Sequence, residues 1–534
     1  MRRALRSDDL ALALFLILAV TGLVLWVYRV NAATPLIFDE LLYLWQARLL
    51  ATGHLTAATP VHHEFVSVLH LFDLDGRCFG QYPIGYPLAL IPWVVAGIPW
   101  GLNVFLGGAS LLLLYRFASR LDGRATAWVA MLLTALSPFF VVQSTTFLVH
   151  PLTLALTLLL ALLRRERSSR RAGWAGLAGA TIGYAGNISP FLVVPMLAVS
   201  ADRWLSTRRT RPVDRRQLIA FTMPLLAGVA LFCAVNYGTT GSPWRPAYFL
   251  QSWVRPGFGE TVDKSGYTPI EALINTEDRL ANLNRMLFGW PFSSFLFAGP
   301  YLAIAFARHL ARRGEPRAEP IPSERGPLGS DRWTRTLIVL FAGTVGIYAF
   351  WYFPGTRDGL GPRYFYATLP ALSLFSARGV VALGRILRLA ARGRGHADLL
   401  GRTVPSLLLA ALTVTGTIPM FARMAETGPP RGRREVRAFL DDLEQRGIRR
   451  GTVFVTEGSV RKYQRSALLY WSDFSDSKDL VFALDLGPRK NAEFVKDRGG
   501  GPVYYVTLTN ENRSWRLSDA PAGESQAPET SLAR

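Results

Sequence analysis

Two adjacent carboxylates, Asp39 and Glu40, follow the first hydrophobic segment of the chain. A carboxylate is costly next to hydrocarbon, so an acidic pair at a membrane boundary marks a candidate functional site. Asp39 also precedes a helical pattern over 40–52 that ends at Gly53. A structural role as helix N-cap, with Glu40 favourable in the first turn, is therefore one explanation. The other is that Asp39 is a general base acting on an acceptor, and a helix start would hold such a base rigidly.

The two carboxylates are not expected to share one role. Adjacent helical positions diverge by about 100°, so both side chains should not reach the same substrate atom. We expect Asp39 to be the base and Glu40 to be structural or a metal ligand. In the helix that follows, one face is apolar and the other more polar, which predicts an amphipathic helix at the membrane interface. The apolar positions are Leu41, Leu44, Trp45 and Leu49, and the polar ones are Tyr43, Gln46 and Arg48.

Composition indicates a membrane protein with substantial water-exposed parts. Half of the 534 residues are hydrophobic, and the mean hydropathy is +0.21. The formal net charge of +21 would suggest nucleic acid in a soluble protein. Here the arginines form short clusters between apolar runs, which is the positive-inside pattern. We therefore expect no nucleic-acid partner, and attraction to anionic membrane lipids as a secondary effect.

Apolar runs predict about 11 membrane spans. They lie near 10–30, 101–115, 125–142, 148–163, 172–187, 190–204, 218–237, 288–307, 336–354, 365–387 and 403–422. The run 86–99 is too short to cross, and prolines interrupt it. The basic clusters all fall on the cytoplasmic side only if 86–99 does not cross, so we assign it to an interfacial or re-entrant helix. The N-terminus is then cytoplasmic, and the chain after about 423 is extracytoplasmic.

The C-terminal region changes character. Residues 430–510 predict a small extracytoplasmic α/β domain, following a transmembrane domain over 1–425. Strands are expected at 452–456, 480–484 and 503–508. A polar tail over 511–534, rich in Pro, Ser, Ala and Glu, is expected to be disordered. The predicted fold class is thus a multi-span α-helical membrane protein, with interfacial helices in its first outer loop and this α/β domain at its end.

Other polar side chains in the outer loops have two explanations each. His62, His63 and Glu64 could hold a metal ion, or form an ordinary polar loop. His150, at the start of a span, could face a cavity or cap its helix. Tyr82 and Tyr86 could contact sugar or lipid, or belong to an aromatic belt at the membrane surface.

Several segments, taken in order, resemble the GT-C membrane glycosyltransferases. An Asp-Glu pair after the first span, followed by an interfacial helix, is typical of that family. Gln81–Leu88 is similar to its Tyr-Pro-Pro-Gly-x-Pro-Leu segment, Ser137-Pro138 closes the third span in the same way, and Gly361-Pro362-Arg363-Tyr364 is similar to its Gly-x-Arg-Tyr segment. The family includes protein O-mannosyltransferases and aminoarabinose transferases. The resemblance covers roughly 1–425.

The resemblance implies an enzyme that moves a hexose or pentose from a polyprenyl-phosphate donor to a lipid, glycan or protein acceptor. The reaction would occur on the outer face of a bacterial cytoplasmic (inner) membrane, in assembly of the cell envelope. By this resemblance Asp39 is the general base. Arg363, with Arg357 as second choice, would bind the donor phosphate because a guanidinium holds two phosphate oxygens. Tyr364 would join Tyr82, Tyr86 and His150 in binding substrate, no cofactor is certain, and a divalent metal ion stays an open alternative.

Two departures from the family limit the match. Aminoarabinose transferases carry Glu-Lys-Pro-Pro where this chain has Gln81-Tyr82-Pro83-Ile84, so a phosphate-binding Lys is missing. Many relatives carry Arg where this chain has Ser189 before Pro190. Donor binding therefore differs, or Arg363 carries more of it. A transporter or flippase of lipid-linked glycans, and an inactive assembly partner, are the alternatives. The near absence of ionisable residues within the assigned spans favours an enzyme.

Overall fold

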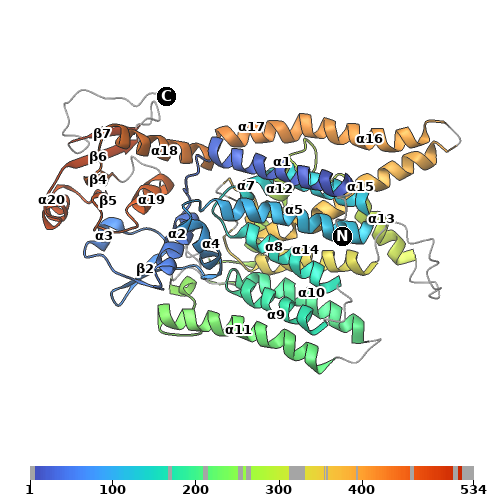
Figure 1. The fold of residues 1–534 in the computed structure, drawn as a ribbon, viewed down its shortest axis with the longest axis horizontal. Coiled ribbons are helices and arrows are strands. Elements are labelled where there is room, and N and C mark those ends of the chain that lie inside the picture. Colours follow the sequence, from blue (N-terminus) through green and yellow to red (C-terminus); the bar gives the residue numbers. More distant parts are fainter. Residues whose placement is uncertain are drawn as a thin grey trace, which may run out of the picture.

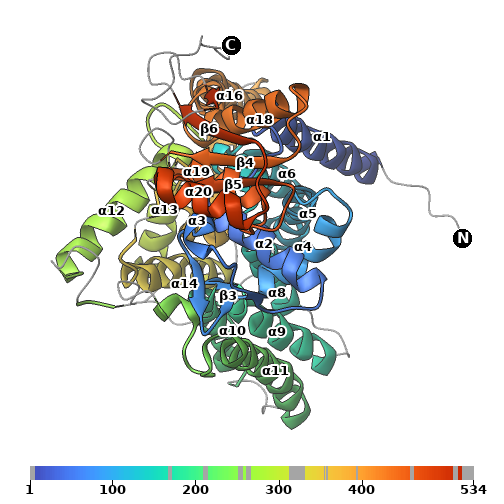
Figure 2. The same cartoon turned by 90° about the vertical axis from the view of Figure 1, so that its left-hand side faces the viewer.

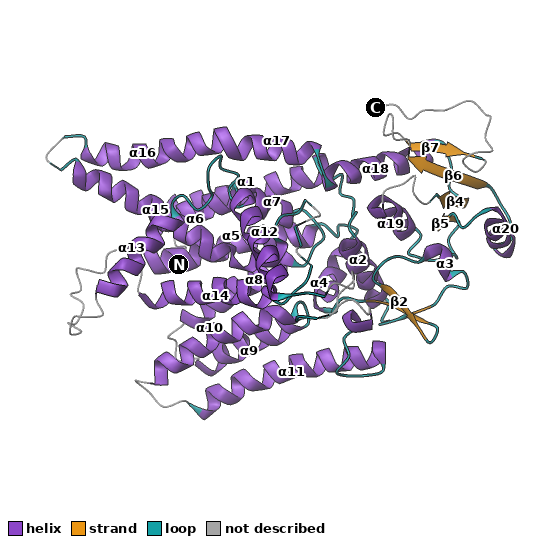
Figure 3. Ribbon diagram, turned by 180° about the vertical axis from the view of Figure 1, so that it is seen from behind, coloured by secondary structure: helices purple, strands orange, loops and turns teal. Residues whose placement is uncertain are grey.

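The apolar runs form helices that lie side by side along the long axis of the molecule, with the strands gathered at one end (Figures 1 and 3). The structure is a computed structural model. It describes residues 7–165, 171–208, 214–250, 257–259, 266–311, 331–353, 355–356, 359–392, 395–456, 462–508 and 515–519.

Each predicted span overlaps a helix. The bundle helices are α1 (Ser7–Arg29), α5 (Gly101–Asp122), α6 (Arg124–Ala135), α7 (Pro138–Ser144), α8 (His150–Arg165), α9 (Arg171–Gly186), α10 (Pro190–Arg208), α11 (Arg215–Thr240), α13 (Ala298–Ala311), α14 (Asp331–Ala349), α15 (Leu369–Ala390), α16 (Ala397–Leu412) and α17 (Ile418–Glu426). Of the helices described, five are long and apolar enough to cross a membrane, or six if α6 and α7, bent by 64°, form one span. The count of about 11 spans stays a prediction.

Large apolar surfaces on these helices have no protein cover. None of the apolar window of α11 is buried, and only 11% of that of α1. Side chains such as Ile17 and Met223 are more than half exposed. Uncovered apolar faces of this size need hydrocarbon around them. The chain is accordingly a multi-pass membrane protein.

An ion pair fixes the interior of the bundle far from the strands. Arg378 of α15 binds both carboxylate oxygens of Asp122, at 2.7 and 3.1 Å, and both side chains are fully buried. The same guanidinium donates to the hydroxyls of Tyr301 on α13 and Thr334 on α14. Because α5, α13, α14 and α15 meet at this one charge, their relative positions are set at this end of the bundle.

The first outer loop contains α2 (Phe38–Ala51), α3 (His63–Val66) and α4 (Gly85–Val95). Its strands β1 (Ala57–Ala58), β2 (Leu71–Leu74) and β3 (Arg77–Gly80) form an antiparallel sheet in the order β1-β3-β2. The run 86–99 is therefore helical over its first part, as expected. The polar face predicted for α2 is buried rather than exposed, while the position of α2 at the membrane interface stays a prediction. Tyr43 and Gln46 on its polar face are as buried as the leucines, because α2 lies between the bundle and the C-terminal sheet.

The C-terminal region contains a four-stranded sheet in the order β5-β4-β6-β7 (Figure 2). β4 (Gly451–Val455), β5 (Leu480–Leu484) and β6 (Val503–Leu508) are parallel and match the three predicted strands. Helices α18 (Pro429–Gln445), α19 (Lys462–Trp471) and α20 (Pro488–Asp497) accompany them. One hydrophobic core joins this sheet to α2, α4 and α8. The division into domains near 430 stays a prediction.

The start of the predicted disordered tail differs from the expectation. Within 511–534, Trp515–Ser518 form β7, antiparallel to β6. Trp515 stacks on Phe439 at 4.8 Å and donates to the carbonyl of Glu435, so a buried aromatic side chain holds this strand. The remainder of the predicted tail lies outside the described residues.

The contact between α9 and α11 generates a first prediction. A Cβ at Gly179 would collide with the backbone carbonyl of Phe221, whereas one at Gly173 on the same helix would meet nothing within 4 Å. Gly179→Ala should therefore destabilise the protein by about 1–3 kcal/mol through overpacking. Gly173→Ala should not. Thermal unfolding of both variants in the same detergent measures the difference, and equal midpoints would contradict this packing.

Candidate functional site

The first turn of α2 sets the positions of the acidic pair. The helix begins at Phe38 with Ile37 as N-cap, so Asp39 is its second residue and Glu40 its third. The N-cap role considered for Asp39 is thus wrong. Glu40 instead reaches back, and its Oε2 accepts from the backbone N–H groups of Leu36 at 2.9 Å and Ile37 at 3.1 Å. These are donors that a helix start leaves without partners.

Glu40 is enclosed by protein. Its Oε1 accepts from the backbone N–H of Phe147 at 3.0 Å and from Nη2 of Arg433 at 2.7 Å. Both Glu40 and Arg433 are fully buried. Arg433 lies on α18 and also donates to the carbonyl of Thr34. Glu40 therefore connects the loop before α2, the loop before α8 and the C-terminal region, and it presents no surface to a substrate.

Asp39 faces two different donors. Its Oδ1 accepts from the hydroxyl of Tyr82 at 2.7 Å, and its Oδ2 lies 3.3 Å from Nη2 of Arg363. Burial alone would raise the pKa of Asp39. The charge of Arg363, then that of His70 and the hydrogen bond from Tyr82, outweigh it, so that the pKa is lowered. The carboxylate is ionised at neutral pH, and its side chain keeps 19% of its surface exposed.

Arg363 is presented by a short 3₁₀-helix, η4 (Arg363–Thr368), that precedes α15. The turn before it needs glycine, because Gly361 has φ +77° and a Cβ there would lie 2.9 Å from the sulfur of Met286. The guanidinium lies near two aromatic rings, 5.7 Å from the centre of Tyr364 and 5.9 Å from that of Phe353. The Gly-x-Arg-Tyr segment is thus built to hold one cation beside Asp39.

Aromatic side chains extend from Asp39 in a chain of contacts. Tyr43 packs on Tyr82 at 4.7 Å, and Tyr82 on Tyr248 of η1 (Ala247–Leu250) at 5.5 Å. Burial, followed by the charge of Asp39, raises the pKa of Tyr82 well above its usual value. The Tyr82 hydroxyl is therefore protonated and donates a hydrogen bond to Asp39. The sequence did not single out Tyr43 or Tyr248, because tyrosines are common at membrane surfaces.

A second group of aromatic side chains lies at the end of α14 and in the segments that follow it. Tyr364 stacks on Tyr348 at 4.8 Å, and its hydroxyl accepts from Nε1 of Trp351. His150, at the start of α8, lies 6.4 Å from the Tyr364 ring and close enough to influence Asp39. The predicted residues Tyr82, His150, Arg363 and Tyr364 are therefore brought together around Asp39.

Tyr86 is placed differently from Tyr82. Its hydroxyl donates to Oδ1 of Asn103 at 3.1 Å, and its ring packs edge-on against Tyr43. Asn103 in turn donates to the carbonyls of Thr146 and Leu148. Tyr86 thus supports the loop before α8, one shell of side chains behind Asp39.

A second buried guanidinium lies near the site and was missed. Arg279 of α12 (Pro269–Met286) is fully buried and donates to three carbonyls, those of Tyr348, Trp351 and Phe353, at 2.6–2.9 Å. A cation at the end of α14 is favourable there, and it fixes the segment that leads to Arg363. Its position on the helix face of Ala272, Leu283 and Met286 is the signal that could have revealed its burial.

The candidate metal ligands do not converge. His62 lies 3.3 Å from Asp497 of α20, while His63 lies 3.8 Å from Glu64, and both of these last side chains are about half exposed. Within the described ranges, no three His, Cys, Asp or Glu side chains form a group that could hold a metal ion. Arg357, the second phosphate candidate, lies outside the described residues.

The buried pair at Glu40 generates a second prediction. Arg433→Met would leave the Glu40 carboxylate buried without its cation, at a cost of about 3–5 kcal/mol. Arg437→Met is the matched control, because Arg437 lies on the same helix in an exposed pair with Asp441 and should change stability by less than about 1 kcal/mol. Combining Arg433→Met with Glu40→Gln should recover part of the loss. Thermal unfolding of the four proteins tests this, and equal effects of Arg433→Met and Arg437→Met would contradict it.

No protein-family model matches the sequence, and no curated protein does either. Solved structures do match over nearly the whole chain. ArnT from Cupriavidus metallidurans in the apo state is 13% identical, with a TM-score of 0.53 and coverage of 93% of both chains. ArnT is an aminoarabinose transferase of the GT-C fold. At this identity the similarity shows that the present chain shares the GT-C fold.

Two further structures are more distant. ArnT from the same organism bound to undecaprenyl phosphate is 12% identical, with a TM-score of 0.49 and coverage of 92% of this chain and 89% of ArnT. The archaeal oligosaccharyltransferase AglB from Archaeoglobus fulgidus, in complex with an inhibitory peptide and a dolichol-phosphate, is 12% identical, with a TM-score of 0.43 and coverage of 92% and 69%.

Proposed function

We propose that this chain, which has the GT-C fold, is an integral-membrane glycosyltransferase. It would move a hexose or pentose from a polyprenyl-phosphate donor to an acceptor hydroxyl on the extracytoplasmic face of a bacterial inner membrane. The observation that carries the proposal is the pair formed by Asp39 and Arg363. An ionised carboxylate and a guanidinium lie 3.3 Å apart, in a chain whose helices α1 and α11 leave large apolar faces uncovered by protein.

The pair supplies both charges that the reaction needs. Asp39 takes the proton of the acceptor hydroxyl as the acceptor oxygen attacks the anomeric carbon of the sugar. The bond between that carbon and the phosphate oxygen breaks, and the polyprenyl phosphate leaves with the electron pair. Arg363 stabilises the charge that develops on the departing phosphate. Attack from the side opposite the phosphate inverts the configuration at the anomeric carbon.

The contact between the two residues also explains how Asp39 can become a sufficient base. A carboxylate whose pKa is lowered by Arg363 accepts a proton weakly. When a donor phosphate takes Arg363 as its partner, Asp39 loses part of that stabilisation and becomes more basic. Tyr82 keeps the carboxylate in place during the exchange. Proton transfer is then favoured only while the donor is bound.

The surrounding residues take supporting roles in this proposal. Tyr364 and His150 lie near Asp39 and Arg363, and we assign them to binding of the sugar or the acceptor. Arg279 holds the segment before Arg363, and Glu40 holds the start of α2. The departures at Tyr82 and Ser189 fit a site in which Arg363 carries more of the donor binding. Ser189 contacts the hydroxyl of Tyr348 at 3.2 Å.

The alternatives differ from this function in a testable way. A flippase would use the outer site to release a lipid-linked glycan without breaking a bond, and an inactive partner would need no base. Asp39 lies beside the Arg363 guanidinium and a Tyr82 hydroxyl whose raised pKa keeps it protonated. This placement favours an enzyme over a flippase or an inactive partner.

Replacing the base gives the third prediction. In a strain lacking the gene, Asp39→Asn should fail to restore the mature glycan or glycolipid, because a loss of about 10²–10⁴-fold in proton transfer is expected. The acceptor that lacks the sugar should accumulate, and its structure would identify the acceptor substrate. Profiling of glycolipids and glycans measures this, with membrane levels of the protein compared by immunoblot.

Asp73→Asn is the matched control, because Asp73 lies on β2 of the same outer loop and its side chain accepts from Thr59 rather than facing Arg363. It should restore the wild-type profile. Full complementation by Asp39→Asn at normal protein levels would exclude the proposed base and favour the flippase or partner.

The charge of Arg363 gives the fourth prediction, on pH dependence. The pKa of Asp39 is lowered in the donor-free wild type, chiefly by the charge of Arg363, so the acid limb that it causes in kcat/KM should lie below the usual range of an aspartate. Without Arg363, the effect of burial dominates and the pKa rises. Arg363→Gln should therefore move the acid limb of kcat/KM to higher pH, measured at limiting donor so that it reports the donor-free enzyme, and an unmoved limb would contradict the pairing.

A further inference from the structure

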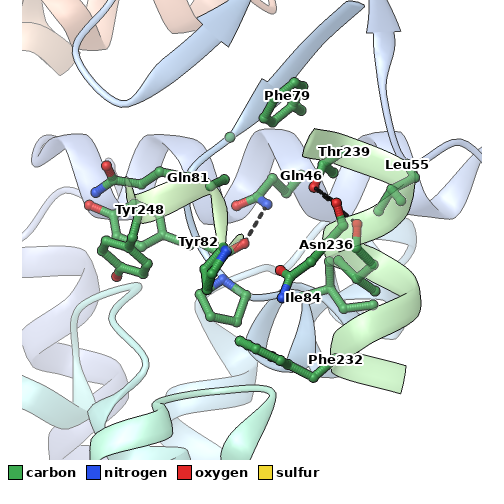
Figure 4. A pocket seen from close by; sticks show the side chains of 15 residues that line it. Gln46, Leu55, Phe79, Gln81, Tyr82, Ile84, Phe232, Asn236, Thr239 and Tyr248 are labelled. Carbon is green, nitrogen blue, oxygen red and sulfur yellow. Dashed lines mark hydrogen bonds between the residues drawn. The ribbon is translucent and has the colours of Figure 1, made fainter. Parts of the chain in front are cut away.

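A hollow lies beside Tyr82. It is enclosed by α2, by the segment after β3 and by the last turns of α11 with the loop that follows (Figure 4). Figure 4 shows Gln81 and Tyr248 on one side, Asn236 and Phe232 on the other, and Gln46 between them. The empty space is about 380 Å³, a figure that includes open solvent at the mouth of the hollow.

Two carboxamide oxygens in this wall have no hydrogen-bond partner, Oε1 of Gln46 and Oε1 of Gln81. Both residues are more than nine-tenths buried, with 7% and 5% of their surfaces exposed. Nε2 of Gln46 donates to the carbonyl of Tyr82 at 2.9 Å, which fixes this side chain and leaves its oxygen unused. A buried acceptor without a donor costs about 1–3 kcal/mol. The hollow is therefore suited to a ligand that brings donors.

The other residues that line the hollow indicate the charge and polarity of the ligand. The fifteen lining residues all belong to the described part of the chain, and none of them carries a charge. Phe79, Phe232 and Tyr248 contribute apolar and aromatic surface. Hydroxyl groups around an uncharged ring with apolar C–H faces satisfy both requirements. A uronate or an ammonium group would find no opposite charge here, and burying it would be costly.

Tyr82 links this hollow to the proposed base. Its hydroxyl donates to Asp39 at 2.7 Å, while its carbonyl accepts from Gln46 at 2.9 Å. Gln46 and Asp39 also lie on the same helix, α2. A ring held by Gln46 and Gln81 would therefore lie one side chain away from Asp39.

We propose that this hollow binds a neutral sugar residue, whose hydroxyl groups donate to the carboxamide oxygens of Gln46 and Gln81. The inference rests on the proposed glycosyltransferase function and narrows its substrate class to uncharged sugars. The ring is either the sugar to be transferred or a sugar of the acceptor. The chemistry of recognition is the same for both.

The first variant that tests this is Gln81→Leu, which removes one acceptor at nearly constant volume and leaves Gln46 on Tyr82. Gln464→Leu is the matched control, because Gln464 also has a buried, unpartnered Oε1 but lies on α19. Gly80→Ala is a second variant. A Cβ at Gly80 would lie 2.9 Å from Cδ of Gln46 and would push that side chain from its position.

The probes are undecaprenyl phosphate, undecaprenyl phosphate linked to glucose, and methyl glucoside, each with the full-length protein in nanodiscs. Dissociation constants are measured for the two lipids, and saturation-transfer NMR signals for the glycoside. If the pocket holds the donor sugar, Gln81→Leu and Gly80→Ala weaken binding of the glucose-linked lipid about tenfold. Binding of undecaprenyl phosphate then stays unchanged. If the pocket holds an acceptor sugar, both lipids bind normally and only the glycoside signal is lost.

Other results overturn the inference. These are unchanged binding of all three probes, or an equal loss for undecaprenyl phosphate with and without glucose, which would make the hollow a lipid site. An equal effect of Gln464→Leu would show that the loss is not local. Wild-type protein that binds neither lipid would contradict the proposed donor class instead, while the glycoside signal in wild type and variants would still decide what the hollow binds.

Discussion

The carboxylate of Glu40 is the interaction on which the site depends. It has no access to water, and it is satisfied by two backbone N–H groups at the start of its own helix, by the N–H of Phe147 and by Arg433. A buried charge is tolerated only with such complete pairing. Since Asp39 precedes Glu40 directly, fixing Glu40 fixes the direction in which Asp39 points. The C-terminal region, through Arg433, thus takes part in placing the residue proposed to perform the chemistry.

The arrangement around Asp39 separates three tasks among neighbouring groups. Tyr82 holds one carboxylate oxygen and Arg363 holds the other, and in the proposed reaction a donor phosphate competes for Arg363. Arg279 holds the backbone that presents Arg363. If the proposed reaction is right, the low proton affinity of Asp39 in the resting protein is a property of this pairing. It would change as soon as donor binds, so the resting site and the loaded site would differ in basicity without a large movement of the chain.

The sequence revealed the parts of this arrangement that depend on short local segments. Asp39, Tyr82, His150 and the segment from Gly361 to Tyr364 stood out through composition, position and resemblance, and the structure brings them together. Arg433 could not be found in this way, because its partner lies 393 positions earlier in the chain and an arginine on a polar helix is ordinary. Arg279 was missed although its position on the helix face of Ala272, Leu283 and Met286 was a signal of its burial. The spacing in α2 was misleading, since a helix covered on all sides can still carry polar residues at buried positions, as Tyr43 and Gln46 show. The apolar runs predicted where helices form, but hydropathy does not determine how many of them cross.

The most direct test of the account is a cryo-EM map of the protein in nanodiscs with undecaprenyl phosphate. We predict density for the phosphate within hydrogen-bond distance of the Arg363 guanidinium and beside the Asp39 carboxylate, with the contact between these two side chains lengthened. A phosphate bound away from Arg363, with the pair between Arg363 and Asp39 intact, would contradict the central claim that these two residues form the centre for sugar transfer.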